Sequence, residues 1–159
     1  MKLKEIRTKY KLSQLEAANL VSVPVRTFRR YENDDSYGSE LKRQMFINII
    51  VEHCEVTETK GLLTIEQIKN SIKELFESQH KSEIEFCYLF GSYAKGYAKE
   101  DSDIDLCVST SLTGLKFVGL SEDIRNVLHK KIDLIRFSNL KDNLDLINEI
   151  MKDGIKLYG

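Results

Sequence analysis

The sequence of 159 residues lacks any segment that could cross a membrane or direct export. No apolar run approaches the roughly 20 residues that a bilayer-spanning helix needs. The first residues, MKLKEIRTKY, contain neither an apolar stretch nor a small-residue cleavage site, so they do not form a signal peptide. These absences predict a cytoplasmic protein. The composition, 42% hydrophobic and 31% charged, predicts packed globular structure rather than disorder.

Cysteine and histidine are also scarce, with three residues of each and no Cys-x-x-Cys pair. The wide spacing of the cysteines excludes a metal cluster built from them, and the histidines share no ligand spacing. We expect reduced thiols in or near a core and partly exposed histidines on helices. The residues concerned are Cys54, Cys87, Cys107, His53, His80 and His129.

An excess of charge of one sign is absent as well, because 24 basic residues accompany 25 acidic ones. This balance excludes a uniformly basic nucleic-acid coat, although it permits a local basic patch. Residues 1–36 carry eight basic and five acidic residues, whereas residues 61–159 carry 13 basic and 16 acidic ones. The opposite signs suggest two units with different partners. The polar segment Glu55–Gly61 is the expected linker, which places the units at 1–57 and 62–159.

Four short helices account for the first 57 residues. A helix over about 2–10 precedes one over about 14–20, which Ser13 and Glu16 begin with a capping box. Pro24 suits the first position of a third helix, which ends near residue 32. A fourth helix in LKRQMFINIIVEH is expected to close the core with one apolar stripe, formed by Leu41, Met45, Phe46, Ile49 and Ile50.

The third helix is expected to carry arginines on its outer face. Phe28 and Tyr31 would point inward and pack with Leu20 and Val23. Two helices joined by a tight turn, the second with Arg and Thr facing out, fit a DNA major groove. Gln14 could reach a phosphate from the start of the second helix. A helical bundle with a solvated arginine face explains the pattern equally well. The outward residues are Val25, Arg26, Thr27, Arg29 and Arg30.

The second half alternates helix and strand signals around a glycine turn. A helix over Ile65–Phe76 leads to the strand EIEFCYLF, which runs into Gly91 and Ser92. Glycine permits a tight turn and a close approach of the backbone to a ligand. A helix that starts near Ser92 would offer free N–H groups to an anion. The strand that follows lies in DSDIDLCVS, where Asp103 and Asp105 share a face because they are two residues apart.

Paired carboxylates repel each other unless they are exposed, protonated or bridged by a cation. Such hard oxygen ligands suit Mg²⁺, which also binds substrate phosphates. Asp133 interrupts the apolar run of a later strand, KKIDLIRF. If that strand lies beside Asp103 and Asp105, the three carboxylates would complete a cation site. An acidic loop edge and a solvated strand end remain the alternatives for these residues taken singly.

The first unit resembles the XRE/Cro type of helix-turn-helix over the stretch LSQLEAANLVSVPVRTFRRYEN. The turn departs from that family at Ser22, and Asp34 replaces a frequent glycine after the third helix. Neither departure touches the outward face. The resemblance implies binding of operator DNA, commonly as a dimer that reads two half-sites. It rests on Leu12-Ser13-Gln14, Ala18, Val23, Phe28 and Tyr31-Glu32.

The second unit resembles the nucleotidyltransferase superfamily. The segment GSYAKGYAKEDSDIDL contains its signature, Gly-Ser followed by ten residues and Asp-x-Asp, and Asp133 matches the third carboxylate. The size and the ending EIMKDGIKLYG resemble the minimal nucleotidyltransferase (MNT) group. Tyr93 departs from the pattern, because many members have arginine there. The two resemblances together imply an α+β protein, with an all-α helix-turn-helix bundle followed by a small α/β domain with a mixed sheet.

The nucleotidyltransferase resemblance also implies roles for particular residues. Gly91 and Ser92 would hold the β- and γ-phosphates of ATP, and Lys95 could replace the missing arginine. Asp103 and Asp105 would ligate two Mg²⁺ ions. Asp133 would share one metal ion and help to deprotonate the acceptor hydroxyl.

The same resemblance implies a partner. Members of the minimal group commonly act as antitoxins of HEPN-domain RNases and transfer AMP from ATP to a tyrosine of the toxin. A helix-turn-helix fits this role, because antitoxins often repress their own operon. Two alternatives stay open: a nucleotidyltransferase acting on a small molecule or a nucleic-acid end, and a non-catalytic transcription regulator with a transferase-like fold. The N-terminal helices could also bind protein rather than DNA.

Overall fold

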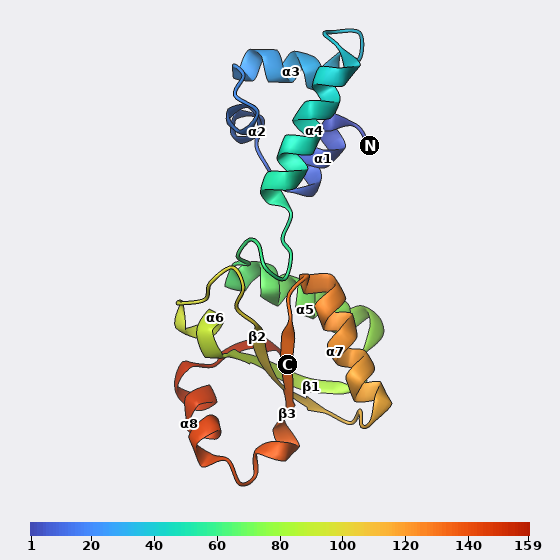
Figure 1. The fold of residues 1–159 in the computed structure, drawn as a ribbon. Helices are drawn as coiled ribbons and strands as arrows, with labels where there is room; N and C mark the ends of the chain where they lie inside the picture. Colours follow the sequence, from blue (N-terminus) through green and yellow to red (C-terminus); the bar gives the residue numbers. More distant parts are fainter. The chain divides into compact units, whose positions relative to one another are not determined.

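The structure, a computed structural model, describes residues 1–159 and divides into two compact units, Met1–Glu55 and Val56–Gly159. The first unit contains only helices, whereas the second contains a sheet with helices packed on it (Figure 1). None of the helices combines the length and the apolar character that a membrane span requires.

The first unit consists of four helices around an aromatic core: α1 (Leu3–Lys9), α2 (Gln14–Leu20), α3 (Val25–Asn33) and α4 (Glu40–Cys54). The capping box predicted at the start of α2 is confirmed, because Ser13 Oγ accepts from Glu16 N and the Glu16 carboxylate accepts from Ser13 N. Phe28 and Tyr31 are buried, as predicted.

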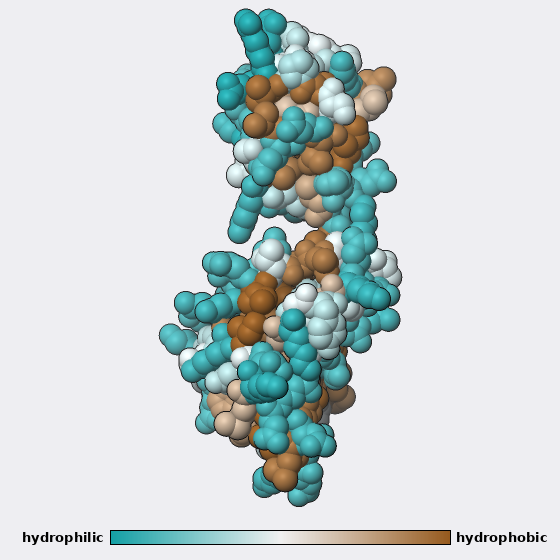
Figure 2. Space-filling view, turned by 90° about the vertical axis from the view of Figure 1, so that its left-hand side faces the viewer, coloured by the Kyte–Doolittle hydropathy of each residue, from teal (hydrophilic) through white to brown (hydrophobic).

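The apolar stripe predicted on α4 is only partly correct. Phe46 and Ile50 are buried, but the other three members, Leu41, Met45 and Ile49, are exposed. Figure 2 shows that the surface of the first unit carries apolar as well as hydrophilic residues. The buried face of α4 instead contains Ile47 and Arg43, so it is rotated from the one that hydrophobicity alone indicates.

Arg43 is buried because its guanidinium group satisfies the backbone around the end of α3. It donates to the carbonyl oxygens of Tyr31 at 3.2 Å and Tyr37 at 3.0 Å, and to the Glu40 carboxylate at 2.6 Å. A charged side chain can occupy an interior position when its donors are all used in this way.

The second unit is built on one mixed sheet in the strand order β3-β2-β1-β4. Strands β2 and β3 run parallel, while β1 is antiparallel to both β2 and β4. The strands are β1 (Ile84–Phe90), β2 (Ile104–Thr110), β3 (Ile132–Arg136) and β4 (Ile155–Tyr158). The helices are α5 (Ile65–Gln79), α6 (Gly91–Lys95), α7 (Leu115–Leu128), α8 (Leu144–Asp153) and the short 3₁₀ helix η1 (Phe137–Leu140).

Both faces of the sheet are covered. Helices α5 and α7 pack on one face, where Ile104 and Leu106 are fully buried. On the other face Cys107 packs with residues of η1 and α8. A bulge in β1 between Ile84 and Phe86 interrupts the strict alternation of this strand. We call the core between the sheet and helices α5 and α7 the first core. The bulge explains why Ile84 joins Cys87 and Leu89 in this core, whereas Phe86 points to the other face of the sheet.

The segment expected as the linker, Glu55–Gly61, makes contacts with the second unit. Thr57 and Lys60 close a turn by an isolated bridge. Arg125 Nε donates to the Glu58 carboxylate at 2.6 Å, and Gly61 N donates to the Glu100 carboxylate at 3.2 Å. The polar composition of this segment therefore reflects a turn that is fixed by charged side chains.

Candidate active site

Asp105 and Asp133 lie side by side on the parallel strands β2 and β3. The two residues are register partners, and the pair that precedes them is Ile104 with Ile132. Neighbouring strands lie about 4.8 Å apart. Because Ile104 and Leu106 point into the first core, the two aspartates share the opposite face. The sequence-based prediction that Asp133 stands next to the Asp-x-Asp motif is therefore confirmed for Asp105.

Several carboxylates lie near Asp105 and disfavour its negative charge. Burial raises the pKa of Asp105 to about 6, and the charges of Asp133, Asp103 and Glu149 act in the same direction. Asp103, which precedes β2 and is exposed, makes no ion pair, and neither do Asp105 and Asp133. A cluster of this kind stabilises a proton or an added cation.

The chemistry of these side chains fits a hard divalent cation, although the protein does not arrange them as a closed cage. No three acidic, histidine or cysteine side chains have the spacing of a metal-binding group. Carboxylate oxygens without competing basic partners are the ligands that Mg²⁺ uses when substrate phosphates complete its coordination. The residues therefore fit a cation that arrives together with a phosphorylated substrate.

Gly91 brings the backbone of the next turn directly against Asp105. It follows Phe90, the register partner of Asp105 on β1, and it begins α6 with a φ of 70°. A Cβ atom at this position would lie 2.1 Å from Asp105 Oδ2. Both the positive φ and the close contact require glycine. Ser92 follows in the first turn of α6, so the Gly-Ser pair and the aspartates occupy one corner of the sheet.

Glu149 is a fourth carboxylate at this corner, and nothing in its local sequence marks it. We call the corner formed by the Gly91-Ser92 turn and these four carboxylates the acidic corner. It lies on α8, its charge contributes to the raised pKa of Asp105, and it accepts a hydrogen bond from Lys95 Nζ at 2.7 Å. This ion pair connects α6 with α8. The hydrogen bond to Glu149 is also the main cause that raises the pKa of Lys95. The packing of α8 on the sheet places Glu149 here, which the spacing of motifs could not reveal.

Residues 70–159 match the family model for the polymerase beta nucleotidyltransferase domain. The match includes all four strands and every acidic residue of the corner described above. The chain belongs to the polymerase beta nucleotidyltransferase family. As a nucleotidyltransferase, it carries the Gly-Ser turn and the three aspartates in the part of the chain that the family model covers.

Two relatives of this nucleotidyltransferase are similar over most of their own length. Protein adenylyltransferase MntA of Thermococcus cleftensis is 40% identical over an alignment of 92 residues, and the match covers 53% of this chain and 88% of the relative. MJ1215 of Methanocaldococcus jannaschii is 42% identical over an alignment of 74 residues, and the match covers 42% of this chain and 85% of the relative. A chain in the crystal structure of a toxin-antitoxin with AMP-PNP has a TM-score of 0.49 and 26% identity, and the match covers 57% of this chain and 73% of that chain.

Tyr93 does not take part in the acidic corner of the nucleotidyltransferase. Its side chain is buried in the core between the sheet and helices α5 and α7, and burial raises the pKa of its hydroxyl group. The position at which many nucleotidyltransferases have arginine therefore contributes packing here and no charge. Lys95 remains the basic residue nearest in sequence to the Gly-Ser turn.

A buried lysine, which the sequence did not reveal, fixes the loop that leads into Asp103. Lys130 is fully buried, and its Nζ donates to the carbonyl oxygens of Glu100 at 2.5 Å and Lys60 at 3.3 Å. Burial lowers the pKa of Lys130, against the charges of Glu100 and Asp101. Ile104 N also donates to Lys131 O at 2.9 Å. The Asp-x-Asp motif is therefore anchored to Lys130 and Lys131, which come directly before β3. Strand β3 itself carries Asp133.

The residues predicted to contact DNA lie on α2 and α3 of the first unit. Arg26, Arg29 and Arg30 are exposed, whereas Val25 and Thr27 are half-buried. The interpretation of all five as outward-facing is therefore correct for the arginines and only partly correct for the other two. Gln14 is half-buried as well.

Gln14 has protein partners at both ends of its side-chain amide. Its oxygen accepts from Arg29 Nε at 2.8 Å, and its nitrogen donates to the Glu32 carboxylate at 2.7 Å. Glu32 also accepts two hydrogen bonds from Arg7. These contacts hold α1, α2 and α3 together on one surface.

Proposed function

We propose that this nucleotidyltransferase transfers AMP from ATP to a hydroxyl group of a HEPN-type toxin protein and so acts as its antitoxin. The observation that carries the proposal is the register pair Asp105 and Asp133 beside Gly91, within residues 70–159, which match the nucleotidyltransferase family model. MntA is named a protein adenylyltransferase and is covered over 88% of its length. The toxin as acceptor follows from the resemblance of the Gly-Ser and Asp-x-Asp motif to the minimal group.

We propose a role in this reaction for each residue of the acidic corner. Gly91 and Ser92 would hold the β- and γ-phosphates of ATP through their backbone and hydroxyl groups. Lys95 Nζ donates to the Glu149 carboxylate at 2.7 Å. When ATP binds, Lys95 would leave this partner and donate to a phosphate oxygen instead. Asp103 and Asp105 would hold two Mg²⁺ ions, and Asp133 would share one of these ions. When bound, the ions supply neutralisation of the phosphate charge and polarisation of the α-phosphate.

The transfer step is a displacement at the α-phosphorus. The acceptor hydroxyl oxygen forms a bond to that phosphorus while the bond to the oxygen bridging to the β-phosphate breaks, and pyrophosphate leaves. Asp133, exposed on β3, accepts the proton of the hydroxyl. The protein's share of catalysis is then the positioning of the two reactants and the stabilisation of charge.

We expect Asp103→Ala to abolish AMP transfer, since it removes one metal-binding carboxylate from the corner. The test incubates the protein and a co-expressed HEPN-domain protein with ATP labelled at the α-phosphate, and measures both labelling of that protein and neutralisation of its toxicity. Asp101→Ala removes a charge from the same loop and serves as the control that should retain activity.

Other outcomes of this experiment favour the alternatives. Label on a small molecule and none on protein would replace the proposed acceptor. Full neutralisation by Asp103→Ala without labelling would mean that the chain masks its partner without catalysis.

We also propose that the first unit binds operator DNA through α3, as one half of a homodimer. This proposal is supported by three exposed arginines on one helix whose neighbour α2 is fixed to it by the Gln14 contacts. Arginine can bond guanine bidentately in the major groove, and dimers of such modules read two half-sites.

Arg26→Ala is expected to weaken operator binding by about 5- to 100-fold, the loss typical of one base contact. Arg26 tests this more cleanly than Arg29, because Arg29 also holds Gln14. Gel shifts with the DNA upstream of the gene measure the effect, and Lys4→Ala, an exposed basic residue on α1, is the matched control. Equal shifts for Arg26→Ala and the wild type would contradict DNA binding by this face.

A further inference from the structure

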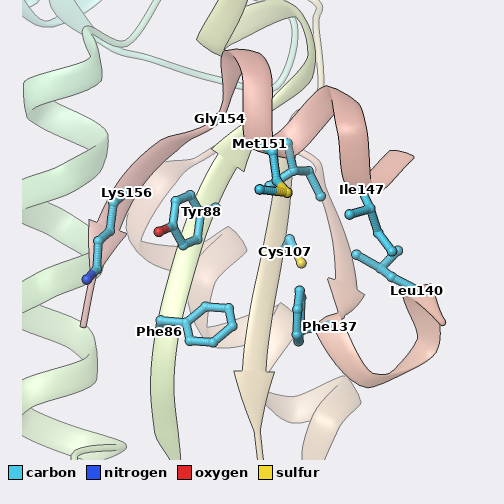
Figure 3. Close-up of a pocket in the computed structure, with 10 residues that line it drawn as sticks. Phe86, Tyr88, Cys107, Phe137, Leu140, Ile147, Met151, Gly154 and Lys156 are labelled. Carbon is cyan, nitrogen blue, oxygen red and sulfur yellow. The ribbon is translucent and has the colours of Figure 1, made fainter. Parts of the chain in front are cut away.

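An apolar pocket of about 390 Å³ lies on the same face of the sheet as the aspartates. Its volume is within the roughly 300–1,000 Å³ of typical ligand pockets. Strands β1, β2 and β4 form its floor, and η1 and α8 form its wall. Figure 3 shows Phe86 and Tyr88 projecting from β1, Cys107 from β2 and Met151 from α8 over the strands. We call it the α8 pocket.

The register of the sheet connects the α8 pocket to the acidic corner. Cys107 is two residues beyond Asp105 on β2, so both side chains point to the same face. Their partners on β1 are Tyr88 and Phe90, which are also two residues apart. Two residues of a strand span about 7 Å. The pocket therefore begins one side-chain repeat away from Asp105.

The rim of the α8 pocket suits a protein rather than a nucleotide. Met151 is 82% exposed and Phe137 is 46% exposed, although both line the pocket. Exposed apolar residues around a hollow mark interaction surfaces, and a bound protein would cover them. Tyr88 and Lys156 are the only lining residues with a strongly polar side-chain group, and Lys156 stands apart on β4 (Figure 3). A buried nucleobase would find few partners for its ring nitrogens here.

We propose that the α8 pocket binds an apolar side chain of the acceptor protein, two residues away from the hydroxyl group that receives AMP. The inference rests on the proposed transfer to a protein. In an extended acceptor segment, side chains on one face repeat every two residues, or about 7 Å. When the hydroxyl group of the acceptor lies at Asp105 and Asp133, the acceptor side chain two positions away therefore lies in the α8 pocket. The pocket thus selects which hydroxyl of the partner is modified.

The first experiment separates acceptor binding from nucleotide binding. Met151→Lys and Phe137→Lys introduce a charge at the rim, and Asn148→Lys introduces the same charge at an exposed site of α8 outside the pocket. We expect both rim variants to raise KM for the HEPN-domain acceptor at least tenfold and to leave the Kd of AMP-PNP with Mg²⁺ within about twofold of the wild type. Asn148→Lys should change neither quantity.

Two results of this experiment would overturn the inference. A weakened affinity for AMP-PNP in the rim variants would assign the pocket to the nucleobase. An unchanged KM in both rim variants would show that the acceptor does not use the pocket. Thermal melting of each variant identifies one that fails to fold, and Met151, being exposed, gives the safer substitution.

A charge exchange gives the second experiment. Once mass spectrometry has located the modified hydroxyl, the apolar residue two positions away is replaced by Asp in the acceptor. This change should lower transfer by the wild-type enzyme, and Met151→Lys should restore it. The absence of an apolar residue at that distance, or of any rescue, contradicts the inference. A wild-type enzyme that labels no protein would instead refute the proposed function, and this inference with it.

Discussion

Asp105→Asn is expected to make the metal-free protein more stable at neutral pH, even though it lowers the activity. In the folded protein the pKa of Asp105 is raised from 3.8 to about 6 by burial and by the neighbouring carboxylates. One pKa unit corresponds to about 1.4 kcal/mol. Because Asp105 is only partly buried and water screens its charge, relief from this charge should add about 1–2 kcal/mol to the free energy of unfolding. Loss of a charge-stabilising group at the reacting phosphate should lower kcat on the order of 10²–10³-fold.

The stabilisation by Asp105→Asn should depend on pH in a defined direction. Between about pH 4 and pH 6 the folded protein binds more protons at Asp105 than the unfolded chain does, so its stability falls as pH rises through this range. The advantage of the variant should therefore be absent below about pH 4 and complete above about pH 6.

Urea unfolding in the presence of EDTA at several pH values measures this dependence. Asp142→Asn, at an exposed position in the loop before α8, is the control that should show no such effect. Mg²⁺ with AMP-PNP should stabilise the wild type more than Asp105→Asn. An advantage of equal size at pH 3.5 and pH 7.5 would contradict a charge-based cause.

Gly91→Ala is expected to damage both stability and activity. The left-handed conformation, with φ at 70°, costs a non-glycine residue about 1–2 kcal/mol. In addition, the new Cβ would lie 2.1 Å from Asp105 Oδ2, so the carboxylate must move. Because displacement of a catalytic group by about 1 Å can cost a factor of 10², we expect a loss of at least that order in kcat/KM.

Gly96→Ala separates the two causes of this damage. Gly96 also has a left-handed backbone, with φ at 82°, but a Cβ there would meet nothing within 4 Å. Gly96→Ala should thus lose only the conformational contribution, about 1–2 kcal/mol, and keep its activity. If both variants have the same transfer rate, the contact between Gly91 and Asp105 does not position the carboxylate.

Local periodicity was sufficient to predict β1, β2 and β3 and the face that Asp103 and Asp105 share, but it indicated neither β4 nor Glu149. Ile104 and Leu106 alternate with Asp103 and Asp105, and this alternation alone separates the buried face of β2 from the functional one. An acidic residue within an apolar strand is costly, which marked Asp133 as a candidate, and the family resemblance indicated its place beside the Asp-x-Asp motif. These patterns are local, so the sequence displays them directly.

The charged residues that sequence analysis missed are those whose partners lie in other elements of the fold. Arg43 occupies the core because carbonyl groups around the end of α3 require donors. Lys130 is buried because the carbonyl oxygens of Lys60 and Glu100 converge on it. Glu149 joins the acidic corner only through the packing of α8. The partners of Lys130 and Glu149 lie 30 to 70 residues away in the chain, whereas those of Arg43 lie within 12 residues, at the end of α3 and in the loop that follows it.

The position of β4 in the sheet has a consequence for folding kinetics. This strand pairs with β1, so that partners such as Cys87 and Tyr158 are about 70 residues apart in the chain. The contacts of the first unit are much more local, since α1 to α4 lie within 55 residues. Because folding slows as the average sequence separation of contacts grows, refolding from urea should show a fast helical phase followed by a slower phase in which the sheet closes. Competence to bind AMP-PNP should return only with the slower phase.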